Sequence, residues 1–218
     1  MRFMNTELAR FNMVEQQIRP WSVLNLSVLE QLSQLDRSLF VPAAYQEVAY
    51  SDTEIPLLHG EFMLAPRVAA RLAQDLLLQA SDTVVEIGTG SGYLSALLAS
   101  LSSKVLSLEC HADILARAQT HLQLAGCRNV ELRQSEGVPQ HLLPVDAIVL
   151  TGSVAQVPEE LLKLLKPGGR LIAVVGEEPI MQATRFTRGS HGDMHSQVLW
   201  DVVLPRLHGF AQTPAFQF

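Results

Sequence analysis

The chain has 218 residues, of which 48% are hydrophobic, and it carries a formal net charge of −6 at pH 7. This length suits one large domain, or one core with an extension, and the hydrophobic fraction argues against a disordered chain. The negative charge and the lack of a long Lys/Arg cluster argue against a nucleic acid as the main partner. The N-terminus is polar and no apolar run reaches transmembrane length, so we expect a cytoplasmic protein without a signal peptide or a membrane span.

The first 80 residues predict a mostly helical extension. Apolar residues recur at helical spacing over 6–18, and a second helix follows a cap at Ser22 or Asn25. The segment 49–56 predicts a loop with at most a short edge strand. A turn then leads into a third helix over 66–78, whose first position is a proline, the place where a missing N–H costs nothing.

The stretch 83–93 organises the rest of the chain. It reads Thr-Val-Val-Glu-Ile-Gly-Thr-Gly-Ser-Gly-Tyr, an apolar run that breaks into three glycines ahead of a helical segment over 94–101. A strand, a glycine turn and a helix together make a nucleotide-cofactor site, because glycine lets the backbone approach the ligand and helix N–H groups point at it. A dinucleotide fingerprint would need its third glycine at Tyr93. Glu86 adds a carboxylate that suits a cation better than a pyrophosphate, so we predict S-adenosylmethionine; a tight turn without a ligand is the alternative.

Strand and helix patterns alternate after this turn. Repeated β-α units imply a parallel sheet covered by helices on both faces, and the last two segments predict an antiparallel hairpin. We therefore predict an α/β protein with a helical N-terminal extension and substrate-side turn over 1–80 and a cofactor-binding core over 81–218. The predicted strands are 104–109, 130–133, 146–150, 170–175, 181–188 and 197–204, the predicted helices are 112–124 and 158–165, and a short loop-helix region runs to 143.

Ligands in such a sheet bind beyond the carboxyl ends of the strands. Glu109 ends the second strand about 20 positions after Gly88, the offset of the acidic residue that binds ribose hydroxyls; a solvated carboxylate is the alternative. Glu136 ends the third strand and is a weaker candidate to accept a hydrogen bond from an adenine amino group. The fourth strand ends in Thr151-Gly152-Ser153, where a methyl acceptor would lie. This tripeptide does not resemble the Asn/Asp-Pro-Pro-Tyr/Phe motif of enzymes that methylate nucleic-acid amines.

These motifs resemble those of the protein-L-isoaspartate O-methyltransferase family, over about residues 36–176. The resemblance implies a Rossmann-like, class I S-adenosylmethionine-dependent methyltransferase with a seven-stranded, mostly parallel sheet. It also implies methyl transfer to the carboxylate of an isoaspartyl residue in damaged protein, as in protein repair. The matching segments are Phe40-Val41-Pro42, Ala49-Tyr50-Ser51-Asp52, 85–93, Asn129-Val130, Pro158 and 166–170. The predicted cofactor-binding residues are Glu86, Gly88, Thr89, Gly90, Gly92, Glu109, Cys110, Glu136, Gly137 and Thr151.

Two departures from the family pattern fall near the site. The family's Gly-Gln-Thr-Ile-Ser-x-Pro is Gly-Glu-Phe-Met-Leu-Ala-Pro over 60–66, so Leu64 replaces the serine usually assigned to the active site. The family's Gly-Asp-Gly is Ser-Glu-Gly over 135–137, which keeps the carboxylate. Methyl transfer to an ionised carboxylate needs alignment and a dry pocket rather than a general base, but a lost hydroxyl removes about 1–3 kcal/mol of binding. We therefore predict an intact cofactor half and an altered substrate half.

The substrate side carries an apolar lip of Phe62, Met63 and Leu64. This lip suits a flatter, less charged acceptor such as an aromatic hydroxyl, although packing against the following helix explains it equally well. His59 is a candidate to orient an acceptor or to act as a base, and a loop histidine without such a role is the alternative.

No metal site is predicted. Cys110 and Cys127 have neither metal-binding spacing nor a disulfide framework, which is typical of small buried side chains in a reducing compartment. His191 and His195 lack a third ligand nearby.

Three functions follow as hypotheses. They are methylation of an isoaspartyl protein or peptide, methylation of a small-molecule acceptor, and non-catalytic binding of S-adenosylmethionine or of a partner. The sequence indicates no oligomeric state.

Overall fold

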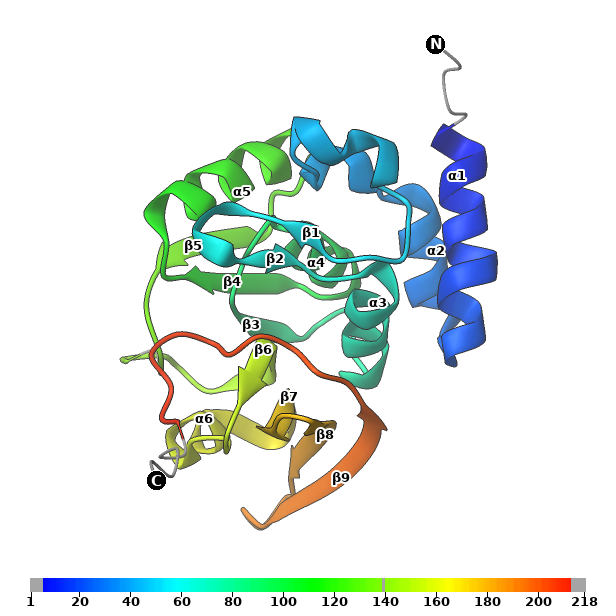
Figure 1. Cartoon of the computed structure of the whole chain (residues 1–218). Coiled ribbons are helices and arrows are strands. Elements are labelled where there is room, and N and C mark those ends of the chain that lie inside the picture. The colour runs from blue at the N-terminus through cyan, green and yellow to red at the C-terminus, as the bar shows by residue number, and fades with distance from the viewer. Residues whose placement is uncertain (1–5, 139, 213–218) are drawn as a thin grey trace.

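The computed structural model describes residues 6–138 and 140–212 and consists of an α/β core joined to an N-terminal helical region (Figure 1). One sheet of seven strands has the order β5-β4-β3-β6-β7-β8-β9. The strands from β5 to β7 pair in parallel, whereas β8 pairs antiparallel with both β7 and β9. The predicted α/β fold with a C-terminal antiparallel hairpin is confirmed. The strands are β3 (Thr83–Ile87), β4 (Lys104–Glu109), β5 (Val130–Gln134), β6 (Val145–Val154), β7 (Leu165–Glu177), β8 (Ile180–Arg188) and β9 (Met194–Asp201).

The helices agree with the sequence pattern, with changes at their ends. The predicted helix over 6–18 begins as an α-helix and continues as a π-helix over Met13–Ile18. Asn25, not Ser22, caps the second helix by accepting from the N–H of Val28. The loop-helix region predicted before 143 contains no helix in its described part. The α-helices are α1 (Thr6–Asn12), α2 (Leu26–Gln34), α3 (Pro66–Asp75), α4 (Tyr93–Leu101), α5 (Ala112–Leu124) and α6 (Glu159–Lys163).

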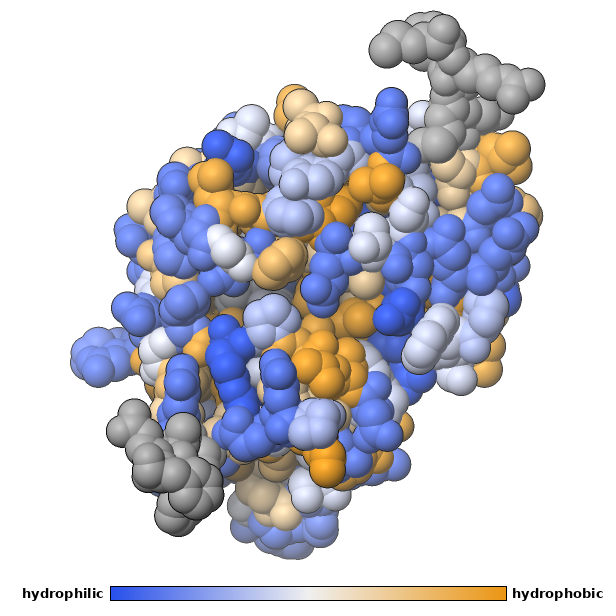
Figure 2. Space-filling model, in the orientation of Figure 1, coloured by the Kyte–Doolittle hydropathy of each residue, from blue (hydrophilic) through white to orange (hydrophobic). Residues whose placement is uncertain are grey.

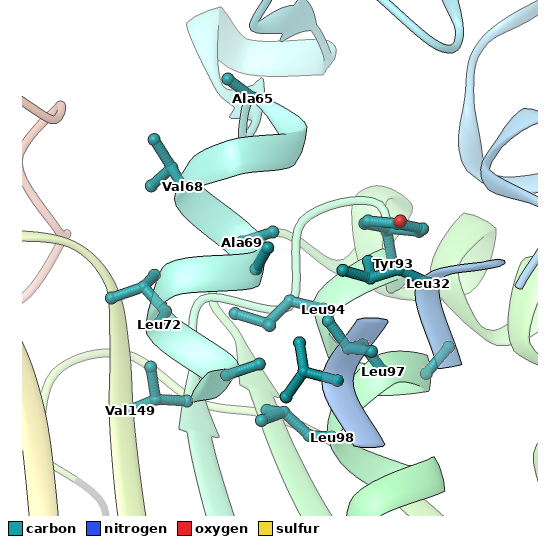
Figure 3. Packing of buried hydrophobic residues seen from close by; sticks show 14 of the residues in the cluster. Leu32, Ala65, Val68, Ala69, Leu72, Tyr93, Leu94, Leu97, Leu98 and Val149 are labelled. Atoms are coloured by element: carbon teal, nitrogen blue, oxygen red, sulfur yellow. The ribbon is translucent and has the colours of Figure 1, made fainter. Parts of the chain in front are cut away.

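Both faces of the parallel sheet are buried. Successive residues of a strand point to opposite faces, and here neighbours such as Val84 and Val85 enter two different apolar clusters. One cluster packs under α2, α3 and α4; Figure 3 shows Leu72 of α3 and Leu98 of α4 in it. The other cluster includes Leu161 of α6. This two-sided burial explains why the central strands β3 and β6 are largely apolar.

A short two-stranded sheet follows the first two α-helices in the chain and precedes α3 and the seven-stranded sheet. It pairs β1 (Ile55–Pro56) with β2 (Phe62–Met63), and the turn between them carries His59 and Gly60. Gly60 has a φ of +78°, which glycine adopts without strain. The hairpin therefore presents β2, including two residues of the predicted apolar lip, in front of the core.

The fully buried Arg37 fixes the residue that follows β2. Its Nε donates to the carbonyl of Ala49 (2.9 Å), and its Nη2 donates to the carbonyl of Leu64 (2.8 Å). The guanidinium also lies over the ring of Tyr93, at 4.6 Å from the centroid. Burial lowers the pKa of Arg37 from its ordinary value. One side chain thus joins the N-terminal region to the lip and to the start of α4.

Arg37→Leu is expected to destabilise the protein by about 2–4 kcal/mol, because two buried carbonyls would lose their charged donor. Urea unfolding followed by circular dichroism measures this change in the free energy of unfolding. The exposed Arg128 offers a matched control, and Arg128→Leu is expected to stay within about 0.5 kcal/mol of the wild type. Equal losses in the two variants would contradict this role for Arg37.

Candidate cofactor and acceptor site

A pocket opens at the carboxyl ends of β3, β4 and β6, the edge of the sheet where the strand order reverses. Its volume is about 930 Å³ including the part open to solvent. Residues 205–208 and β2 also contribute to its wall. In Figure 1 the chain after β9 crosses in front of the sheet here, and Figure 2 shows polar and apolar side chains interspersed on this face.

The glycine turn after β3 is held by the neighbouring strands. Gly88 has a φ of +97°, and a Cβ placed on it would collide with Oγ1 of Thr151. That hydroxyl donates to the carbonyl of Gly88 (2.7 Å) and lies 3.1 Å from the carbonyl of Ile87. The N–H of Gly90 donates to Oε2 of Glu109 (2.9 Å). The turn is therefore fixed in shape before any ligand binds.

Gly92 occupies a different place from the other two glycines. It caps the start of α4 with a φ of +86°, and its nearest neighbours are Ala118 and Leu122 of α5. It is not among the residues that line the pocket. A Cβ on Gly92 would press against α5, so this glycine permits close packing of α4 against α5. The other predicted cofactor-binding residues line the pocket: Glu86, Gly88, Thr89, Gly90, Glu109, Cys110, Glu136, Gly137 and Thr151.

Glu86 is fully buried beneath this turn. The hydroxyls of Ser95 and Ser107 both donate to its Oε2, the latter at 2.6 Å. Its Oε1 is shielded from water and has no hydrogen-bond partner in the described part of the chain. Burial raises the pKa of Glu86 from 4.5 to about 7. The pocket floor therefore holds a carboxyl with one free oxygen, which a bound cation would favour in its ionised form.

Glu109 lies at the end of β4 and is only 5% exposed. Besides the bond from Gly90, its Oε1 accepts from the N–H of His111 (3.1 Å). These two backbone donors fix the carboxylate against the pocket wall. The thiol of Cys110 lies 3.4 Å from the same carboxylate, and desolvation together with this negative charge raises the pKa of Cys110 to about 12. This thiol is neutral near pH 7, so it is no nucleophile.

The segment after β9, residues 202–210, is the part of the site that the sequence analysis missed. We call it the C-terminal segment. It is attached to β6 through Ser153, whose N–H donates to the carbonyl of Pro205 (2.8 Å) and whose carbonyl accepts from the N–H of Leu207 (3.0 Å). Further on, Gly209 packs directly against the backbone of Gly137. No local signal marks this segment, because Ser153 and Gly137, which position it at the pocket, are distant from it in the sequence.

Phe62, Met63 and Leu64, the residues of the predicted apolar lip, line one side of the pocket. Phe62 is 41% exposed and stands at the opening, whereas Met63 is almost buried. His59 does not line this pocket; its Nε2 is bonded to Asp113 at 2.9 Å. This position gives no support to His59 as a base for the acceptor.

The charge of the pocket wall is strongly negative. The one arginine that lines it, Arg206, forms an ion pair with Glu177, and its Nη1 is shielded from water and has no partner among the described residues. The carboxyl groups of five residues line the same pocket: Glu54, Glu61, Glu86, Glu109 and Glu136. Such a wall attracts a cationic cofactor, while an anionic acceptor would depend on Arg206 for compensation.

This fold and this pocket define the class of the protein, the α/β methyltransferases that use S-adenosylmethionine. A sequence model of the family described as protein-L-isoaspartate(D-aspartate) O-methyltransferase matches residues 9–206. The chain therefore belongs to the protein-L-isoaspartate O-methyltransferase family.

Curated relatives and solved structures agree with that membership. The protein-L-isoaspartate O-methyltransferase of Methanoculleus marisnigri is 40% identical over 181 residues, which is 82% of each chain. Protein-L-isoaspartate O-methyltransferase 1 of Syntrophobacter fumaroxidans is 34% identical over 89% of this chain and 92% of its own. A crystal structure from Plasmodium falciparum, described as a protein of this family in complex with S-adenosyl-L-homocysteine, has a TM-score of 0.78 at 23% identity and covers 94% of this chain and 99% of its own. At that identity the structure supports the fold alone.

No helix in the described ranges is long and apolar enough to cross a membrane.

Proposed function

We propose that this protein transfers a methyl group from S-adenosylmethionine to the side-chain carboxylate of an isoaspartyl residue in a protein or peptide. The family match over residues 9–206 carries this proposal, together with relatives of that name at 34–40% identity. A reducing, cytoplasmic location suits the two free cysteines.

The cofactor half of the site is proposed to hold S-adenosylmethionine against the glycine turn. Glu109 is placed to accept hydrogen bonds from the ribose hydroxyls, and Glu136 from the adenine amino group. The free Oε1 of Glu86, a residue that lines the pocket, would stabilise the positive charge of the cofactor's sulfonium and amino groups. When bound, S-adenosylmethionine supplies a methyl carbon that is open to attack because its sulfur carries a positive charge.

The acceptor half needs little chemistry from the protein. A carboxylate is already ionised near neutral pH, so with S-adenosylmethionine bound its oxygen would form the new bond to the methyl carbon while the bond to sulfur would break and sulfur would keep the electron pair. No proton moves in this step. The chain's contribution is to align the acceptor and exclude water, and Arg206 is proposed to hold the anionic acceptor through its free Nη1.

The apolar lip favours a second candidate, an acceptor with less charge than an isoaspartyl carboxylate. Phe62 and Leu64 present hydrocarbon where the family pattern has hydroxyl-bearing residues. A flat aromatic hydroxyl would bury against them without an unpaired polar group. This candidate predicts turnover of aromatic hydroxyl compounds that exceeds turnover of an isoaspartyl peptide.

Leu64→Ser is expected to raise kcat/KM for an isoaspartyl peptide by about 10-fold, because a restored hydroxyl adds one hydrogen bond to the acceptor worth about 1–3 kcal/mol. Initial rates of methyl transfer from labelled S-adenosylmethionine measure the effect. Leu143→Ser is the matched control, since Leu143 is exposed and lies outside the pocket. An unchanged rate in Leu64→Ser would show that the missing hydroxyl does not limit the reaction. Preference for aromatic hydroxyl compounds in both proteins would favour the second candidate.

A further inference from the structure

Three histidines from separate parts of the chain meet at the rim of the cofactor pocket. His59 comes from the turn between β1 and β2, His111 precedes α5, and His208 belongs to the C-terminal segment. The rings of His59 and His111 are stacked with centroids 4.3 Å apart, and the ring of His208 meets His111 edge-on at 5.4 Å. Glu61 lies among them. This cluster has no part in the methyl transfer proposed above.

The ligand atoms within the cluster have nearly the spacing of a metal site. Nε2 of His208 lies 2.8 Å from Oε1 of Glu61, and Nε2 of His111 lies 3.8 Å from the same oxygen. Glu61, His111 and His208 can each offer one ligand atom such that the three atoms lie within 4.8 Å of one another. Two ligands bonded at about 2.0–2.1 Å to a tetrahedral ion stand about 3.3 Å apart, and the two shorter separations bracket that value. Small side-chain movements would therefore bring these atoms to the separations that a bound ion requires.

An ion pair between His208 and Glu61 explains only part of this geometry. Nε2 of His111 is shielded from solvent and has no hydrogen-bond partner in the described ranges, although an imidazole nitrogen ordinarily finds one when buried. Its ring is held in place by the stack with His59, which is itself bonded to Asp113 at 2.9 Å. An imidazole nitrogen that has no hydrogen-bond partner among the described residues and lies 3.8 Å from a carboxylate oxygen is suitably placed to bind a metal ion together with that oxygen.

A second grouping, Glu109 with Cys110 and His111, is a poorer candidate. Glu109 already accepts from the N–H groups of Gly90 and His111, so its carboxylate is committed to the pocket wall. Two imidazole nitrogens and one carboxylate, by contrast, are the donor set of an open zinc site whose fourth position is filled by water.

We propose that Glu61, His111 and His208 form a binding site for a divalent transition-metal ion of the zinc class, which ties the C-terminal segment to the rim of the cofactor pocket. Glu61 and His208 both line the pocket, and His208 directly follows Arg206 and Leu207 in its wall. An ion that joins them would hold the segment closed over the cofactor. This metal site rests on the proposed binding of the cofactor in the pocket and does not depend on which methyl acceptor the protein uses.

The first test is a calorimetric titration of the full chain, metal-free and without a polyhistidine tag, with Zn²⁺. We expect one ion per chain and at least about 10-fold weaker binding for His111→Ala and for His208→Ala. His195→Ala is the matched control, since His195 also pairs with a carboxylate, that of Asp193, but lies at the β8–β9 hairpin. Absence of binding to the wild type, or equal affinity in all four proteins, would overturn the site. Co²⁺ offers a check that does not depend on comparing affinities: its visible absorption should indicate tetrahedral coordination in the wild type and be lost in His208→Ala.

The second test concerns the closing of the pocket. Release of bound S-adenosylhomocysteine, followed by stopped-flow fluorescence, should slow about 5-fold or more when Zn²⁺ is added to the wild type. The ion should have no effect on release from His208→Ala. An unchanged release rate in zinc-bound wild type would overturn the link between the metal and the C-terminal segment.

Discussion

Replacing Glu86 by glutamine is expected to make the folded protein more stable near pH 8 and to weaken its binding of S-adenosylmethionine. The gain in stability follows from burial, which raises the pKa of Glu86 to about 7. Glutamine keeps an oxygen that can accept from Ser95 and Ser107 and removes the buried charge.

The expected gain depends on pH with a definite sign. Between pH 4.5 and about 7 the folded protein keeps a proton on Glu86 that the unfolded chain has released, so the stability of the wild type falls as the pH rises through this window. The penalty is absent below the unfolded-state pKa and complete above about pH 7. A shift of this size corresponds to a penalty on the order of 3 kcal/mol. Urea unfolding of the wild type and the variant at several pH values measures it.

Glu30→Gln provides the control for that measurement, because Glu30 is exposed. It should change stability by less than about 0.5 kcal/mol at every pH. A Glu86→Gln variant that loses stability near pH 8 would show that the buried charge is compensated within the fold.

The loss of cofactor affinity tests the role of the same carboxyl. An ionised Glu86 attracts the cationic cofactor, so the affinity of the wild type should rise with pH and level off above about pH 7. Glu86→Gln should bind about 10-fold more weakly at pH 8 and lose most of this pH dependence. Calorimetric titration with S-adenosylmethionine gives both quantities. Equal affinity of the two proteins at pH 8 would contradict the contact between Glu86 and the cofactor.

Arg206→Leu is expected to lower kcat/KM for an isoaspartyl peptide by about 10- to 100-fold and to leave the cofactor Kd within about 2-fold of the wild type. The reason is the proposed contact of an anionic acceptor with Arg206, whose Nη1 has no hydrogen-bond partner among the described residues and which lines the pocket together with five glutamates. Steady-state kinetics and calorimetry separate the two effects.

Arg206→Lys should retain part of the activity, since it keeps the charge but not the planar donor pair. If cofactor affinity falls as far as turnover in Arg206→Leu, the arginine acts by holding the C-terminal segment in place through Glu177. That outcome would contradict a direct contact with the acceptor.

The glycine turn and the position of Glu109 at a strand end were predictable because their signals are local. A β-branched run followed by closely spaced glycines specifies a strand and a tight turn wherever it occurs, and the offset of Glu109 placed it at the end of the next strand. Gly92 shows the limit of this reasoning. Glycine spacing indicates positions where a side chain would collide with a neighbour, but it does not identify that neighbour. At Gly92 the neighbour is α5 and not a ligand.

The other half of the site arises from contacts between distant parts of the chain. Pro205, Arg206 and Leu207 reach the pocket because Ser153 binds the backbone of the C-terminal segment, and no periodicity in the sequence records that pairing. The histidine cluster depends on the same pairing, because His208 belongs to the C-terminal segment. The end of α3 was also not predicted. The helix predicted over 66–78 ends at Asp75, and Leu77 then adopts a φ of +52°, a backbone conformation that leucine rarely adopts and that its identity therefore does not indicate. The division at residue 80 between an extension and a core stays a prediction.

Mass spectrometry of an isoaspartyl peptide incubated with the protein and methyl-labelled S-adenosylmethionine tests the central claim most directly. The matched substrate is the same peptide with a normal aspartyl residue, which has the same composition and charge. We predict that one labelled methyl ester forms on the isoaspartyl peptide and none on its aspartyl counterpart. A protein that binds the cofactor yet esterifies neither peptide would contradict the assignment of an isoaspartyl carboxylate as the acceptor.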